Sequence, residues 1–282
     1  MVSPLVSAAW LSEHLNDPTV AIADCRFALT QADLGEQQYR KEHIPGAYYL
    51  DLNRDLSSPA KAQGGRHPLP DFPMLAKKLA AIGVCSEPPE APTLVVAYDD
   101  SRFAFAARLW WLLRYLGHYQ VAVLDGGWTG WKAAGYSTSD SVPPSKSGNF
   151  LPKLNARQVV NFDYVKAHKD LPGVILVDAR ESDRYRGERE PIDPVAGHIP
   201  GAVNYPWHDV TTTEGYARSP NEQQQRWTAL SQAEEIIVYC GSGVTACVNL
   251  LSLELAGINT GKLYAGSWSD WCSYLQAVRN EE

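Results

Sequence analysis

The segment His43-Ile44-Pro45-Gly46-Ala47 occurs a second time in the chain, as His198-Ile199-Pro200-Gly201-Ala202. An acidic strand end, Ile22-Ala23-Asp24-Cys25-Arg26, has its counterpart at Leu176-Val177-Asp178-Ala179-Arg180, with nearly the same offset. Unrelated segments that share one offset indicate a tandem duplication, because internal repeats keep a fixed period. The chain is therefore predicted to contain two copies of one fold unit.

Each copy alternates short runs of β-branched residues with longer amphipathic stretches. In the second copy, residues 235–239 read as a strand and residues 244–256 as a helix, which Gly257 ends. Glycine stops a helix because it adopts the left-handed conformation without steric cost. Strands that alternate with helices predict an α/β fold, in which each copy has a mainly parallel central sheet with helices on both faces.

A Ser- and Pro-rich stretch, residues 137–152, separates the two copies and cannot hold a helix. We therefore expect a first domain over residues 1–136, a linker over residues 137–152 and a second domain over residues 153–282. A length of 282 residues also fits two domains better than one.

The composition excludes several kinds of partner. The chain is 45% hydrophobic with a net charge of −7, which suits a globular protein but gives no general attraction to nucleic acid or to an anionic membrane surface. No apolar run approaches the roughly 20 residues that span a bilayer. The first residues also lack the basic start of a signal peptide. We expect a cytoplasmic protein with neither nucleic acid nor membrane as a partner.

The two copies differ directly after the equivalent strand. The first copy has Asp99 there, whereas the second reads Cys240-Gly241-Ser242-Gly243-Val244-Thr245. Gly241 and Gly243 allow the backbone to curl, so that successive N–H groups and the start of the following helix favour an anion. A thiolate at Cys240 would be nucleophilic there at neutral pH, with hydroxyls of Ser242 and Thr245 as further donors. The remaining cysteines are interpreted as buried structural residues: Cys25, Cys85, Cys247 and Cys272.

A phosphatase with a cysteine in a similar loop would need an arginine six residues later to hold the phosphate. That position is Ala246, and no basic residue occurs from Gly241 to Leu255. Phosphatase activity is therefore not expected.

Together, these segments resemble the two-domain rhodanese-like sulfurtransferases over essentially the whole chain. The resemblance rests on the Asp-x-Arg strand ends, the two His-Ile-Pro-Gly-Ala segments, the segment Leu124-Asp125-Gly126-Gly127-Trp128 and the loop that begins at Cys240. It implies two tandem rhodanese-like domains, of which the first is inactive, in agreement with Asp99 at the cysteine position.

The resemblance also implies the chemistry. The Cys240 thiolate takes a sulfur atom from a small-molecule donor, holds it as a persulfide and passes it to a thiophilic acceptor such as thioredoxin, a small thiol or cyanide. No metal and no organic cofactor is implied.

Within this family, the loop Cys-Gly-Ser-Gly-Val-Thr is the pattern of 3-mercaptopyruvate sulfurtransferases, which release pyruvate. The resemblance assigns catalytic roles to Cys240, Ser242 and Thr245. Substrate binding is assigned to Arg184, with Arg186 nearby, and to the remaining loop residues: Gly241, Gly243 and Val244. A carboxylate donor needs such an arginine, because the loop itself has no cation.

One departure from the family pattern keeps other donors open. The better-known mercaptopyruvate enzymes have a second arginine where this chain has Asp193, and Arg189 is a candidate replacement. A thiosulfate:cyanide sulfurtransferase therefore remains an alternative. A persulfide carrier that is loaded by a partner protein is another.

Both histidines of the repeated segment, His43 and His198, are best explained by the shared fold, because a residue that is present in both copies does not mark a single active site. In the mercaptopyruvate branch, an aspartate and a histidine of the first domain act with the loop serine. By position, His43 and Asp33 are the candidates for this proton relay.

Overall fold

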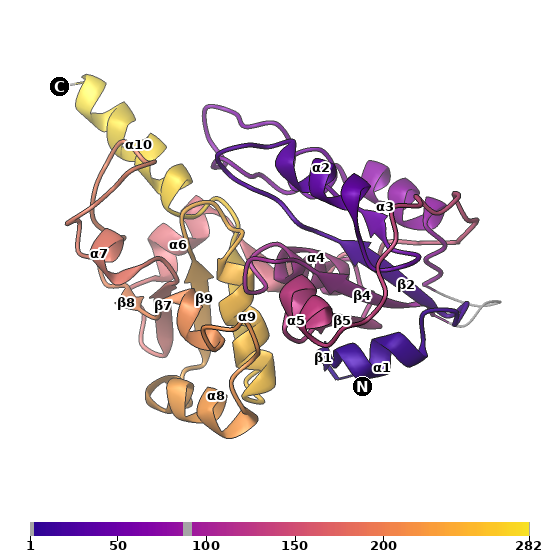
Figure 1. Cartoon of the computed structure of the whole chain (residues 1–282). Helices are drawn as coiled ribbons and strands as arrows, with labels where there is room; N and C mark the ends of the chain where they lie inside the picture. Colours follow the sequence, from indigo (N-terminus) through magenta and orange to yellow (C-terminus); the bar gives the residue numbers. More distant parts are fainter. Residues whose placement is uncertain (1–2, 87–91, 282) are drawn as a thin grey trace. The chain divides into compact units, whose positions relative to one another are not determined.

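The structure is a computed structural model that describes residues 3–86 and 92–281. It divides into two compact units, each built on one five-stranded parallel sheet (Figure 1). The first unit comprises residues 1–58, 70–155 and 211–217, and the second comprises residues 59–69, 156–210 and 218–282. Each half of the chain therefore contributes one short segment to the unit that is built mainly from the other half.

The sheet of the first unit has the strand order β1-β5-β4-β2-β3, and all its pairs are parallel. Its strands are β1 (Leu5–Val6), β2 (Val20–Asp24), β3 (Tyr48–Tyr49), β4 (Leu94–Tyr98) and β5 (Val121–Leu124). The helices are α1 (Ala8–Glu13), α2 (Leu34–Lys41), α3 (Phe72–Ala81), α4 (Ala106–Tyr115) and α5 (Gly127–Ala133).

The sheet of the second unit has the matching order β6-β10-β9-β7-β8, again with parallel pairs only. Its strands are β6 (Val159–Val160), β7 (Val174–Asp178), β8 (Val203–Asn204), β9 (Glu235–Tyr239) and β10 (Gly261–Tyr264). The helices are α6 (Phe162–His168), α7 (Ser182–Tyr185), α8 (Pro220–Trp227), α9 (Ala246–Leu255) and α10 (Ser267–Glu281), with short 3₁₀ turns at Ala156–Gln158, Trp207–Val210 and Thr228–Leu230. The predicted duplication and α/β fold class are confirmed.

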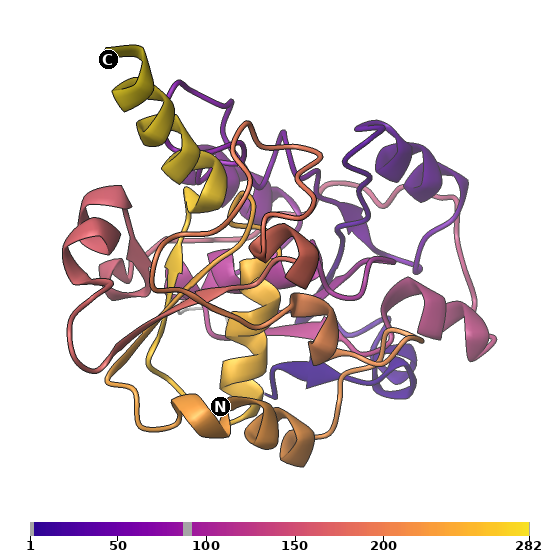
Figure 2. The ribbon, with the colours of Figure 1, turned by 90° about the vertical axis from the view of Figure 1, so that its left-hand side faces the viewer.

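Burial explains why these strands carry runs of apolar residues. All five residues of β2 are buried, and so are four of the five in β9, because helices cover the sheets. In the second unit, α9 packs on β9 and β10, as Figure 2 shows from the side. The loop that begins at Cys240 connects the carboxyl end of β9 to α9.

The repeated sequence segments form the same buried network in both units. In the second unit, Arg180 donates to both carboxylate oxygens of Asp178 and stacks over the ring of Trp268, with 4.8 Å from its guanidinium carbon to the ring centroid. The backbone N–H of Ile199 donates to the hydroxyl of Tyr239. The first unit repeats this arrangement with these residues: Asp24, Arg26, Trp128, Ile44 and Tyr98. The repeats are thus fold determinants.

None of the helices in the described ranges combines the length and the apolar character that crossing a bilayer requires. All five cysteines are buried and free of disulfide bonds.

Candidate active site

Cys240 follows β9 at the carboxyl edge of the second sheet and begins a tight turn into α9. Gly243 has a φ of +77°, a left-handed conformation that glycine alone adopts without strain. A Cβ atom at this position would lie 2.3 Å from the carbonyl oxygen of Ala265. Glycine at position 243 is therefore required both by the backbone conformation and by the close approach of Ala265, the residue after β10.

The turn directs backbone hydrogen bonds at Cys240. The N–H of Gly243 donates to Cys240 Sγ over 3.2 Å. The N–H of Cys240 itself donates to Ser267 Oγ, and its carbonyl accepts from the N–H of Trp268 over 3.0 Å. Because Cys240 is only 2% exposed, these contacts hold a buried sulfur beside a backbone donor.

Ser242 is paired with a histidine from the segment 59–69. His67 Nδ1 lies 2.8 Å from Ser242 Oγ, and both residues are buried. A hydroxyl and an imidazole at this distance form a path for a proton, because either group can donate or accept. The structure thus shows a buried contact between an imidazole and a hydroxyl, and the hydroxyl belongs to the residue two positions after Cys240 in the chain.

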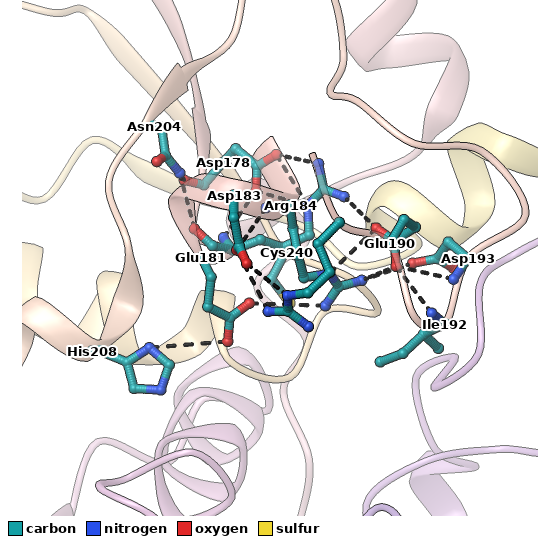
Figure 3. Close-up of polar contacts among 12 residues, drawn as sticks. Asp178, Glu181, Asp183, Arg184, Glu190, Ile192, Asp193, Asn204, His208 and Cys240 are labelled. Carbon is teal, nitrogen blue, oxygen red and sulfur yellow. Dashed lines mark hydrogen bonds and ion pairs between the residues drawn. The ribbon is translucent and has the colours of Figure 1, made fainter. Parts of the chain in front are cut away.

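Arg184 lies next to the loop within a buried set of charges (Figure 3). Its guanidinium contacts both carboxylate oxygens of Glu190, at 2.7 and 3.2 Å, and Asp193 Oδ2 at 3.2 Å. The second oxygen of Asp193 is paired with Arg66. A Cβ atom on Gly241 would lie 3.0 Å from Arg66 Nη2 and 3.7 Å from both terminal nitrogens of Arg184, so the two guanidinium groups border the residue after Cys240.

The other two arginines of this region lie at the surface. Arg186 is paired with Glu188, and Arg189 is paired with Asp183, with each arginine side chain about half exposed. Arg66, and not Arg189, is thus the arginine that shares Asp193 with Arg184.

Val244 and Thr245, which the sequence placed in a helix over residues 244–256, lie in the turn before α9, because that helix begins at Ala246. Val244 is buried, at 5% exposed. Thr245 is the residue before α9, and its side chain makes no capping hydrogen bond to the helix.

Asp33 and His43 have partners other than Ser242. His43 Nδ1 lies 2.7 Å from the carbonyl oxygen of Tyr39, and its Nε2 lies 3.2 Å from that of Ser141. Asp33 is exposed, and its carboxylate accepts a hydrogen bond from Gln37. The hydrogen bonds of the described residues include none between Asp33 and His43. The histidine that meets the loop serine is thus His67.

The equivalent loop of the first unit is filled by an internal carboxylate. Asp99 is buried, and four backbone N–H groups donate to it at 2.8 to 3.1 Å, from Ser101, Phe103, Phe105 and Ala106. Burial raises the pKa of Asp99 to about 6, because the cost of desolvating the carboxylate outweighs these donors. The first unit keeps the anion-binding turn but has no thiol in it.

In the part of the chain that the structure describes, no group of three or more His, Cys, Asp or Glu side chains is placed to hold a metal ion.

Comparison with known proteins places this site in a family. The model of the rhodanese-like domain matches residues 7–134 and again residues 161–274, so that both units are covered. The chain belongs to the rhodanese-like family. Each unit of this rhodanese-like protein corresponds to one family domain, which confirms the resemblance that the sequence segments indicated.

Its relatives and structural neighbours cover nearly the whole chain. A protein from Pseudomonas aeruginosa named "Probable 3-mercaptopyruvate sulfurtransferase" is 45% identical over 272 residues, which are 95% of this chain and 94% of that protein. A Mycobacterium tuberculosis protein named "Putative thiosulfate sulfurtransferase SseB" is 35% identical over 281 residues, with 95% and 94% coverage. The crystal structure of the 3-mercaptopyruvate sulfotransferase SseA from Escherichia coli has a TM-score of 0.79 at 32% identity, and the match covers 95% of this rhodanese-like chain and all of that one.

Reasoning from the sequence missed two residues of the site, Arg66 and His67. Both lie between β3 and α3, in residues 59–69, which belong to the second unit although they come from the first half of the chain. The available signal was the cluster Gly64-Gly65-Arg66-His67, which has no equivalent in the second copy. An arginine and a histidine that occur in only one copy are not explained by the shared fold, and this difference between the copies could have pointed to Arg66 and His67.

Proposed function

We propose that this chain moves a sulfur atom from 3-mercaptopyruvate to a thiophilic acceptor, with Cys240 holding the sulfur between the two steps. The main support is the N–H of Gly243, which donates to Cys240 Sγ over 3.2 Å. A backbone donor directed at sulfur stabilises a thiolate and, by the same electrostatics, a persulfide anion. The names of the relatives agree with this activity.

In the first step, the Cys240 thiolate attacks the sulfur of the donor. An S–S bond forms while the C–S bond of 3-mercaptopyruvate breaks, and the electron pair of the broken bond goes to carbon as the enolate of pyruvate. A proton then converts the enolate into pyruvate. The two sulfur atoms share the oxidation and the carbon is reduced, so that no external redox partner is needed.

The proton of the donor thiol balances the first step. Ser242 and His67 lie within hydrogen-bonding distance of each other, and Ser242 is two residues after Cys240 in the same turn, which suits the pair to move this proton to the enolate carbon. Positioned proton transfer of this kind contributes typically about 10²- to 10⁴-fold to a rate. In this proposal, His67 takes the role that the sequence had assigned to His43.

The carboxylate of the donor is proposed to bind at Arg184 and Arg66. In 3-mercaptopyruvate, the carboxylate carbon is three bonds from the sulfur, and both guanidinium groups border Gly241, the residue after the nucleophile. Arginine suits this role because its planar guanidinium can donate two parallel hydrogen bonds, one to each oxygen of a carboxylate. The loop residues Gly241, Val244 and Thr245 are proposed to line the donor site, and Arg186 to contribute only long-range charge.

In the second step, a thiolate acceptor or cyanide attacks the outer sulfur and releases the Cys240 thiolate. We propose a thiol such as thioredoxin or a small thiol as the physiological acceptor. A cytoplasmic location and the division at residues 136 and 153 remain predictions from the sequence.

Thiosulfate is the second candidate donor, because a relative that is 35% identical is named "Putative thiosulfate sulfurtransferase SseB". Its transfer would break the S–S bond of thiosulfate and release sulfite.

The two donors are separated by steady-state rates with cyanide as the acceptor, with the Cys240→Ser variant as the control. A preference for 3-mercaptopyruvate that is lost in the variant supports the proposal. A preference for thiosulfate favours the second candidate, and undiminished activity in Cys240→Ser contradicts both.

A further inference from the structure

The arginine pair beside Cys240 already holds an anion. Asp193 lies between the two guanidinium groups, with one carboxylate oxygen on Arg66 and the other 3.2 Å from Arg184. Its side chain is only 2% exposed, and Glu190, 4% exposed, contacts Arg184 from another direction. Two cations, the buried Arg184 and the partly exposed Arg66, are thus paired with two buried carboxylates.

The pattern of pairing separates the two carboxylates. Glu190 also contacts Arg180, which forms the buried network with Asp178 and Trp268, and Glu190 therefore belongs to that network. Asp193 contacts only the two guanidinium groups that border Gly241, among the ion pairs of the described residues. Asp193 is thus the anion that occupies the donor side of the cluster.

We infer that Asp193 is an internal carboxylate that occupies the Arg66–Arg184 pair and selects the donor by charge, so that singly charged carboxylate donors are accepted and doubly charged donors such as thiosulfate are disfavoured. This inference rests on the proposed function, because it assigns the anion-binding part of the same site.

The physical basis is the count of charges near Gly241. A monoanionic donor can take one arm of each arginine while Asp193 keeps the others, since each guanidinium has five N–H donors. A dianion brings a second negative charge next to Asp193 and Glu190, and like charges a few ångström apart repel strongly in a buried site. Burial also raises the pKa of Asp193, a sign that desolvation already penalises its charge.

The test compares two donors in three proteins: the natural chain, Asp193→Asn and Asp170→Asn. Asp193→Asn keeps the shape but removes the internal charge. Asp170→Asn makes the same change in net charge, at an exposed aspartate between α6 and β7, on the amino edge of the sheet and away from the loop. We expect kcat/KM for thiosulfate to rise by about tenfold or more in Asp193→Asn. The ratio of the 3-mercaptopyruvate to the thiosulfate value should fall accordingly, and Asp170→Asn should keep the natural ratio.

A binding measurement covers the case in which Asp193→Asn turns over poorly. The Cys240→Ser variant cannot accept sulfur, so ligand binding can be measured in it without turnover. Calorimetry gives the dissociation constants of pyruvate, which carries one negative charge, and of sulfate, which carries two. Asp193→Asn should tighten sulfate more than pyruvate, and Asp193→Ala serves in its place if the first variant does not fold by circular dichroism.

The outcomes separate the two levels of the proposal. If neither donor adds sulfur to Cys240 in the natural chain, the proposed function itself fails. If both donors load Cys240 but Asp193→Asn leaves the donor ratio and the two dissociation constants within twofold of the reference, only the role of Asp193 is overturned.

Discussion

Gly243 offers a direct test of the backbone donor that supports Cys240. Replacing it by alanine forces a φ of +77° on a residue with a Cβ, which costs about 1 to 2 kcal/mol. The new Cβ would also lie 2.3 Å from the carbonyl oxygen of Ala265, so the turn must shift. That shift breaks the hydrogen bond from the N–H of residue 243 to Cys240 Sγ.

The expected loss follows from the value of one hydrogen bond to a charged group, about 1.5 to 3 kcal/mol. Each 1.4 kcal/mol is a factor of ten, so thiolate reactivity should fall roughly 10- to 150-fold. The assay is the rate at which iodoacetamide labels Cys240 at pH 7.5, followed on the Cys240 peptide by mass spectrometry, together with kcat for sulfur transfer. Both rates should fall in Gly243→Ala.

Gly257 provides a matched control. It has a φ of +78°, and a Cβ there would meet nothing within 4 Å, so Gly257→Ala carries the same backbone strain without the clash. Gly257→Ala should lose about 1 to 2 kcal/mol of stability and keep the natural labelling rate. If folded Gly243→Ala is labelled and turns over within twofold of the natural chain, the N–H of residue 243 does not activate the Cys240 thiolate.

Three further predictions address separate parts of the structure. His67→Gln should lower kcat with 3-mercaptopyruvate about 100-fold but change the thiosulfate rate much less, because sulfite leaves without a proton; equal losses with both donors would exclude a proton-transfer role. Arg184→Lys keeps the charge but loses the planar fork, so KM for 3-mercaptopyruvate should rise about tenfold or more in steady-state assays, and an unchanged KM would remove it from the donor site. For Asp99, the raised folded pKa means that the folded state binds the proton more tightly than the unfolded chain, so its contribution to stability falls by up to about 3 kcal/mol as pH rises from about 4 through 6. Urea unfolding at pH 4.5, 5.5 and 7 should show this fall in the natural chain and a flatter profile in Asp99→Asn, whereas parallel profiles would contradict the pKa of about 6.

Much of the fold could be predicted because it depends on local pattern. The strands β4 and β9 are short, buried runs of β-branched residues, and the parallel order follows from their alternation with helices. The repeated segments were visible because both copies need the same network, in which the Asp178–Arg180 pair lies over Trp268.

The site was predictable only in part. The Cys240 turn was visible because its geometry is local and needs glycine at 243. Arg66 and His67 were not, because they lie in a polar loop without periodicity, and only tertiary packing brings them to Gly241 and Ser242. The pairing of Arg66 with an aspartate far along the chain is likewise a tertiary contact that spacing does not encode.

Sulfur transfer through Cys240 is tested by the intact mass of the protein after treatment with 3-mercaptopyruvate, with Cys240→Ser as the comparison and pyruvate measured in the same samples. Transfer through Cys240 predicts one added sulfur atom per chain, located on the Cys240 peptide, removed by cyanide and absent from Cys240→Ser, with pyruvate released in equal amount. Sulfur bound to another cysteine, or pyruvate released at the natural rate by Cys240→Ser, would contradict it.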